Sequence, residues 1–136
     1  MTLLDAQPPK PVTGIRRFVP LPLLILIVAL TIAMASYALW DYPEERAVTN
    51  FLTAVENGQY QKAYQLWQPS KSYSFDDFMH DWGEHGDYGK IHGFEILDSK
   101  SQGSSTVVVT VSINGVDPPL DLLVDRKTKG LAYSFF

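Results

Sequence analysis

The segment TVVVTVSIN, residues Thr106–Asn114, is the clearest strand signal in the chain. Successive side chains of a β-strand point to opposite faces of a sheet, so alternation with a period of two predicts a strand with one buried face. The buried set is predicted to be Val107, Val109, Val111 and Ile113, and the opposite set Val108, Thr110 and Ser112.

Three further strands are predicted on either side of this segment. Lys90–Asp98 precedes it, with His92, Phe94 and Ile96 on one face, and residues 101–104 form a turn. Residues 114–119 contain Asn-Gly and Pro-Pro pairs, which mark a chain reversal. Leu120–Asp125 and Leu131–Phe136 follow as strands, joined by the polar loop 126–130. Four strands in succession predict an antiparallel sheet.

Three helical patterns come before the strands. The first begins near Pro43, carries apolar residues at helical spacing, and closes at residues 57–58. The second runs from Tyr60 to Trp67 and stops before a proline. The third begins at Ser74, with Asp77 in the capping-box position, and ends at residue 83. Helices followed by strands, rather than alternating with them, predict an α+β domain with three helices packed on a curved four-stranded antiparallel sheet.

An uncharged apolar run precedes the domain. Residues 21–40 contain no charged side chain, and twenty helical residues span about 30 Å, the thickness of a hydrocarbon core. Three basic residues and one acid lie before the run, whereas fourteen acids and eight bases follow it. Because basic flanks stay in the cytoplasm, we expect a basic, proline-rich cytoplasmic tail over 1–19, a transmembrane helix over 20–40 in the cell membrane, and an extracytoplasmic domain over 41–136.

A secretory signal peptide is the alternative interpretation of this run. The segment Ala33-Met34-Ala35 resembles a cleavage site, and cleavage near Ala35 would release the domain. The run is longer than the apolar region of a signal peptide, and Tyr37, Trp40 and Tyr42 resemble an interfacial aromatic belt. These observations favour a retained anchor.

Composition excludes several functions. The chain has no cysteine, which rules out disulfides, thiolate catalysis and cysteine metal sites. An acidic domain without clustered positive charge is not expected to bind nucleic acid.

The domain resembles the nuclear transport factor 2-like superfamily over residues 43–136. The resemblance is carried by Ala47-Val48 and Phe51-Leu52, by Asn57-Gly58-Gln59-Tyr60 with Ala63-Tyr64, and by Phe75–Phe78 and Tyr88–Ile91 followed by four strands. It implies a cone in which a curved sheet wraps against helices, and it is similar to small bacterial membrane-anchored domains of uncharacterised function. The superfamily includes both enzymes and non-catalytic binding proteins. No catalytic motif matches, so no active-site residue is carried over.

The candidate site residues are aromatic or lie in one polar stretch. Side chains that could line a ligand pocket of the cone are Tyr64, Trp67, Trp82, His85, Tyr88 and Phe94. Filling of the core is the favoured explanation of the aromatic residues, because small domains without disulfides need large apolar side chains.

The polar stretch 80–87 and His92 offer histidine and carboxylate groups. Their spacing fits neither His-Glu-x-x-His nor its inverse, and an exposed helix end explains them. Acid–base pairs are limited to His85 or His92 with Glu84, Asp87 or Glu95. We therefore predict no catalytic residue, no metal and no cofactor.

The sequence thus predicts a non-enzymatic, single-pass protein whose domain is an interaction or assembly module. The bilayer and another membrane or envelope protein are the expected partners, and a homodimer through the outer sheet face is a further alternative. The competing function is a small-molecule-binding or acid–base catalytic cone. An open cavity would favour that competitor, whereas a filled cone favours the interaction module.

Overall fold

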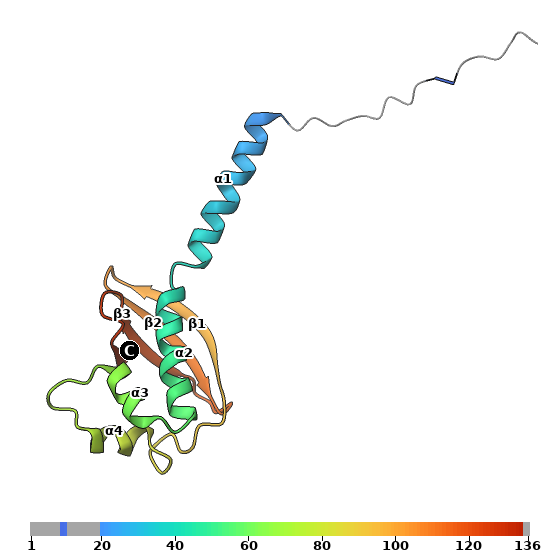
Figure 1. Cartoon of the computed structure of the whole chain (residues 1–136). Helices are drawn as coiled ribbons and strands as arrows, with labels where there is room; N and C mark the ends of the chain where they lie inside the picture. The colour runs from blue at the N-terminus through green and yellow to red at the C-terminus, as the bar shows by residue number, and fades with distance from the viewer. Residues whose placement is uncertain (1–8, 11–19, 135–136) are drawn as a thin grey trace, which may run out of the picture. The chain divides into compact units, whose positions relative to one another are not determined.

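The computed structural model describes residues 9–10 and 20–134 (Figure 1). Contacts divide the chain into two units, Met1–Met34 and Ala35–Phe136. The tail predicted over 1–19 and the terminal pair Phe135–Phe136 lie almost entirely outside the described residues.

Helix α1, Leu21–Ala38, coincides with the predicted apolar span. None of its side chains is buried, and it carries no acidic or basic residue in its first or last turn. At about 1.5 Å per residue it is about 27 Å long. Among the described residues it is the helix with the length and apolar character needed to cross a membrane.

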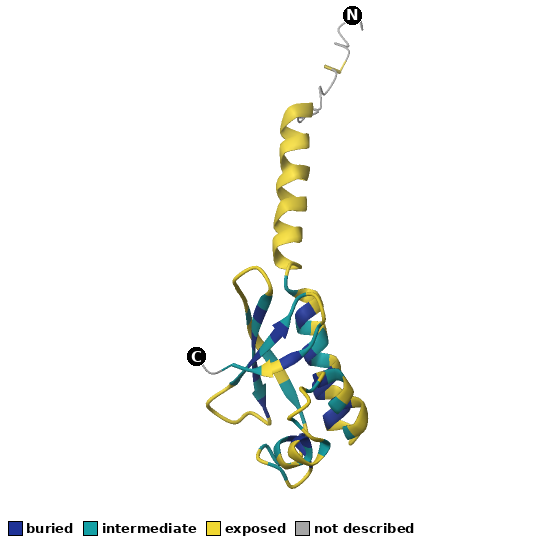
Figure 2. Cartoon of the chain, turned by 90° about the vertical axis from the view of Figure 1, so that its left-hand side faces the viewer, coloured by how far each residue is buried: buried dark blue, intermediate teal, exposed yellow. Residues whose placement is uncertain are grey.

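The second unit has the predicted α+β architecture. Helices α2 (Tyr42–Glu56), α3 (Tyr60–Trp67) and α4 (Phe75–Trp82) come first. Strands β1 (Phe94–Gln102), β2 (Thr106–Ile113), β3 (Leu120–Asp125) and β4 (Leu131–Tyr133) follow. Both views place α2 along one face of the curved sheet, with α4 beyond the lower end of the sheet (Figures 1 and 2).

Local signals set the helix ends as predicted. A proline lies in the first turn of α2, together with Glu44 and Glu45. Asp41 is the N-cap residue, and the helix ends at Glu56, before Asn57. The capping box of α4 forms in full: Ser74 Oγ accepts from the Asp77 amide at 3.1 Å, and Asp77 Oδ2 accepts from the Ser74 amide at 2.9 Å.

The sheet is an antiparallel meander in the order β1-β2-β3-β4. Along β2, buried and partly exposed residues alternate over the whole strand, which confirms the predicted inner and outer faces. In the register, Val109 lies opposite Leu122, and both are completely buried.

The predicted bounds of the first strand are wrong. The strand begins at Phe94 rather than Lys90 and runs to Gln102, so the turn is confined to residues 103–105. Residues 90–92 are held instead by the side chain of Asn114, which accepts from the His92 amide at 2.7 Å and donates to the Lys90 carbonyl at 3.0 Å.

A β-bulge between Ile96 and Asp98 explains why the sequence pattern did not predict the second half of β1 as strand. It shifts the alternation, so that Ser99 lies opposite the buried Val109 and Ser101 opposite Val107. These inward serines hydrogen-bond to acids at the start of α2, Ser99 to Glu45 and Ser101 to Asp41. The alternation read from sequence cannot reveal polar residues on an inner face.

The other strands differ less from the prediction. Strand β2 ends at Ile113, one residue early, because Asn114 adopts a left-handed backbone with φ of 53°. Strand β3 has the predicted bounds. Strand β4 ends at Tyr133, and residues 135–136 of its predicted extension are outside the described residues.

Aromatic side chains fill the space between the helices and the sheet. Phe51 of α2 contacts Trp67, Phe78 and Trp82, with ring centroids 5.2, 6.1 and 4.9 Å away. Phe51, Phe78 and Trp82 have no exposed surface. Figure 2 shows the buried segments facing each other across the helix–sheet interface.

A buried acid anchors the start of α2 to the β3–β4 hairpin. Glu44 is 2% exposed and pairs with Lys129, while its second oxygen lies 3.6 Å from Arg126 Nη1. Arg126 also pairs with Asp41 at 2.7 Å. Cations from the hairpin therefore neutralise acids beside the segment that leads to α1.

Candidate functional site

A cluster of polar side chains lies at the C-terminal end of α4. The loop 83–89 folds back onto the last turn of the helix, because the Asp87 amide donates to the His80 carbonyl at 3.0 Å. Gly86 makes this possible: a Cβ there would lie 2.5 Å from the His80 carbonyl oxygen and 2.8 Å from that of Asp81. Only glycine fits such an approach.

Asp81 accepts hydrogen bonds from two tyrosines of other segments. The Tyr73 hydroxyl donates to Asp81 Oδ2 at 2.6 Å, and the Tyr133 hydroxyl donates to the same oxygen at 3.1 Å. Tyr73 precedes α4 and Tyr133 belongs to β4, so one carboxylate joins three parts of the fold. Asp81 is partly exposed.

The tyrosines of this cluster remain protonated donors. Burial raises the pKa of Tyr73 well above its ordinary value, and the bonded Asp81 raises it further. Burial also raises the pKa of Tyr133, with Tyr73 and Asp81 adding to the shift. The pKa of Tyr88 is raised by burial and then by Asp81 and Asp87. All three phenols therefore stay protonated near neutral pH, and those of Tyr73 and Tyr133 donate hydrogen bonds to Asp81.

Two tryptophans of the core pack against the tyrosine rings beside Asp81. Trp82 stacks on Tyr88 at 4.6 Å and is nearly parallel to Tyr133 at 6.1 Å. Trp67 contacts Tyr133 at 4.9 Å. The indole nitrogen of Trp82 is buried without a hydrogen-bond partner in the described structure.

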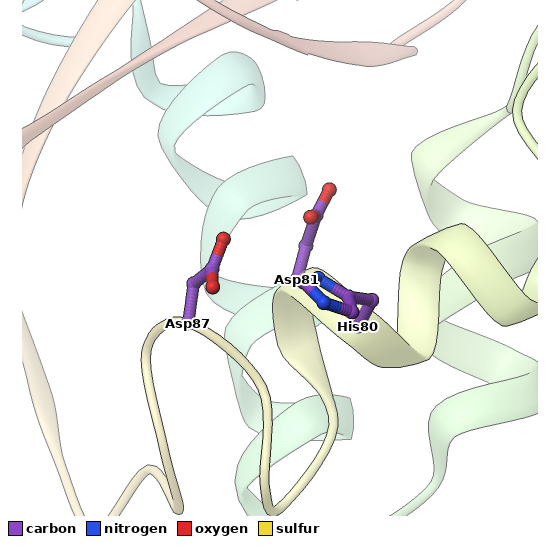
Figure 3. Close-up of side chains that lie close together, drawn as sticks. All are labelled: His80, Asp81 and Asp87. Carbon is purple, nitrogen blue, oxygen red and sulfur yellow. The ribbon is translucent and has the colours of Figure 1, made fainter.

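His80, Asp81 and Asp87 converge at this end of the domain (Figure 3). Each offers one ligand atom, and these atoms lie within 4.8 Å of one another. His80 and Asp81 come from α4, and Asp87 comes from the loop that Gly86 holds against it. A hollow of about 250 Å³ adjoins the cluster, lined by Asp87, Tyr88 and residues of the 113–120 segment.

The six residues predicted from sequence do not share a cavity. Trp67 and Trp82 are core residues. Tyr64 packs partly buried on the core and donates to the Tyr73 carbonyl at 2.7 Å. Tyr88 lines the 250 Å³ hollow, whereas Phe94 lines a different, open hollow with His92 and Glu95.

His85 is exposed in the loop 83–89, on neither hollow that contains Tyr88 or Phe94. Among the predicted acid–base partners, Glu84 pairs with Lys90 at 3.7 Å. His92 and Glu95 line the same hollow, because His92 precedes β1 rather than lying within it.

Sequence reasoning missed the tyrosine pair. Asp81 lies in the polar stretch 80–87, but Tyr73 is eight residues before it and Tyr133 fifty-two residues after it. No local spacing connects them. The one sequence signal was the glycine-rich loop 83–89, which allows a close return of the chain.

The arrangement combines a carboxylate with fixed orientation, neutral phenol donors, an imidazole and a second carboxylate. Such a set suits the binding of a cation or a hydrogen-bonding group. Comparisons with protein-family models, curated proteins and solved structures found no match to this chain.

Proposed function

We propose that this chain is a single-pass membrane protein whose extracytoplasmic domain is a non-catalytic protein-interaction module. The filled interior of the domain carries this proposal. Phe51, Phe78 and Trp82 are completely buried, and Phe51 contacts the other two rings, so the place where a hollow cone would hold a ligand is occupied by side chains. A partner must therefore bind to the outer surface of the domain.

The anchor rests on α1. Its apolar side chains are exposed, with Leu21, Ile25 and Ile32 at 68, 59 and 62%. Exposed apolar surface of this extent on a whole helix is unfavourable in water and favourable in lipid. Arg16 and Arg17 precede the span, which favours a cytoplasmic N-terminus.

We propose that the domain belongs to the nuclear transport factor 2-like superfamily, because three helices precede four antiparallel strands as that fold requires. The assignment rests on this order of elements and on the packing residues of α2 and α3.

The outer face of the sheet is the interaction surface that we propose. Helix α2 runs along the opposite face (Figure 2). The register places Lys100, Val108, Leu123 and Ala132 in one row across the four strands. Leu97, at the bulge, is 52% exposed. A row of apolar residues flanked by charged ones is typical of a modest protein interface.

Charge favours a different protein over a second copy as the partner. In the next row, Asp98 and Asp121 lie on either side of Thr110, whose hydroxyl donates to Asp121. Asp98 pairs with Lys100 at 2.9 Å, so Asp121 is the carboxylate of this row without a cation in the described structure. A self-complementary interface that brings the Asp121 carboxylates of the two copies close together would be unfavourable. A partner with basic side chains would match it.

The topology is tested by labelling single cysteines, since the chain has none of its own. Ser104→Cys, in the β1–β2 turn, should react with a membrane-impermeant maleimide in intact cells. Thr13→Cys should react only after permeabilisation. The reverse pattern, or a mature chain that starts near Ser36, would contradict the anchored topology.

The interaction surface is tested by site-specific photo-crosslinking in the membrane. Lys100 and Ala132 are exposed ends of the outer row, and Lys62 is an exposed control on α3. A photoreactive residue at Lys100 or Ala132 should give a discrete heavier adduct, and one at Lys62 should not. An adduct of twice the chain mass would identify a homodimer instead, and its absence at both sheet positions would refute the surface.

A further inference from the structure

We propose that His80, Asp81 and Asp87 bind a divalent transition-metal ion, with zinc as the preferred ion. One imidazole and two carboxylates form a donor set that zinc accepts. The proposal concerns the end of α4 and does not depend on which partner the sheet face binds.

The geometry needs little adjustment to bind the ion. Zinc bound at about 2.0–2.2 Å holds its ligand atoms about 3.4 Å apart. The ligand atoms here lie within 4.8 Å of one another, so the side chains must close by at most about 1.4 Å. His80 and Asp87 are exposed, and their rotation disturbs no core contact.

The third ligand is already oriented. Tyr73 and Tyr133 both donate to Asp81 Oδ2. The other oxygen, Oδ1, accepts no hydrogen bond from any residue in the described part of the chain, so it is available to an ion. Carboxylate ligands of metals are commonly held by such outer donors, which fix the orientation of the ligand.

The backbone brings the loop ligand to the helix. Asp87 lies six residues after Asp81 and would be distant if α4 continued. The Asp87 amide donates a hydrogen bond to the His80 carbonyl, and Gly86 packs closely against the backbone of the last helical turn. These two contacts place the Asp87 carboxylate beside the helix. The loop is therefore shaped before any ion binds.

Three protein ligands leave a fourth position of a tetrahedral ion for water. Asp87 also lines the 250 Å³ hollow beside Tyr88. The ion would thus stand at the mouth of this hollow, with its open position accessible.

The test is isothermal titration of zinc chloride into the full chain in detergent, after removal of metals with EDTA. We expect saturable binding of one ion per chain. His80→Gln and Asp87→Asn should each weaken binding at least about tenfold. Near-ultraviolet circular dichroism of the metal-free variants verifies that they keep the native packing.

Matched controls come from the same loop. His85→Gln and Glu84→Gln remove an imidazole and a carboxylate that lie outside the cluster, and they should leave zinc affinity unchanged. Tyr73→Phe should weaken zinc binding about tenfold through loss of orientation, whereas Tyr60→Phe should not. Absence of saturable binding, equal losses in the controls, or a preference for calcium over zinc would overturn the proposal.

Discussion

Glu44 is a charged side chain with almost no access to water. Its burial is tolerated because Lys129 pairs with one oxygen and Arg126 approaches the other at 3.6 Å. Both cations come from the β3–β4 hairpin, and both keep partial contact with solvent. Removal of the acid would leave two like charges together at the edge of the core.

We therefore expect Glu44→Ala to lower the free energy of unfolding by about 3 kcal/mol, the lower end of the range for breaking a buried pair. Near-ultraviolet circular dichroism during urea unfolding measures it. The control is Glu56→Ala at the exposed end of the same helix, which should change stability by less than about 0.5 kcal/mol. Equal midpoints for the two variants would show that the buried pairs contribute nothing.

Individual residues with local roles could be predicted from sequence, and residues with distant partners could not. Ser74 and Asp77 were predicted as a capping box, because both partners lie within one turn. Asp81 lay within the polar stretch 80–87, but its bonds to Tyr73 and Tyr133 depend on tertiary packing. The burial of Glu44 follows from a hairpin eighty-five residues away, which no local pattern reveals.

At the scale of elements, α4 depends on its capping box and is therefore sensitive to acid. The hydrogen bonds from Ser74 lower the pKa of the Asp77 carboxyl from its ordinary value of 3.8. A group whose pKa is lower in the folded state stabilises that state above the unfolded value, and the contribution disappears as the pH falls through the folded value. Asp77 should thus stabilise α4 fully above about pH 4.

We expect wild type to be more stable than Asp77→Asn at pH 6 and the difference to shrink as the pH is lowered to 2.5, as measured by urea midpoints at both pH values. Asp98 and Asp125, whose pKa values are also lowered, titrate equally in both proteins and cancel. Asp76→Asn, in the same first turn, is the control and should show a smaller change with pH. A gap between wild type and Asp77→Asn that is as large at pH 2.5 as at pH 6 would contradict this linkage.

Helices were predicted more accurately than strands. The bounds of α3 and α4 agree with their periodic patterns because their start and stop signals are local. Strand β1 was displaced by four residues at both ends, since its limits depend on partners in β2 and on the Asn114 side chain. A bulge and two inward serines are invisible to a pattern that assumes regular alternation.

At the scale of the whole molecule, stability and location are supplied by different parts of the chain. The fully buried apolar residues run from Val48 to Leu131, and α1 has none. The order of helices and strands, and the separation of an apolar span from an acidic domain, were predicted because both depend on composition over long stretches. The filling of the interior was the favoured interpretation of the aromatic residues, but which ring contacts which could not be predicted, because those contacts depend on tertiary packing.

The domain should therefore fold without α1. We expect residues 41–136, expressed alone, to be soluble in water and to unfold cooperatively, with a free energy of unfolding within about 1 kcal/mol of that in the detergent-solubilised full chain. The main loss is the contact of Arg126 with the Trp40 ring, whose centroid lies 5.8 Å away, worth about 0.5–1 kcal/mol. Urea unfolding of both proteins measures this. The full chain should need detergent to stay monodisperse, because the apolar side chains of α1 are exposed along the whole helix. A fragment that is unfolded or aggregated in water would show that α1 contributes packing to the domain, and a full chain that is monodisperse without detergent would show that α1 is not a membrane anchor.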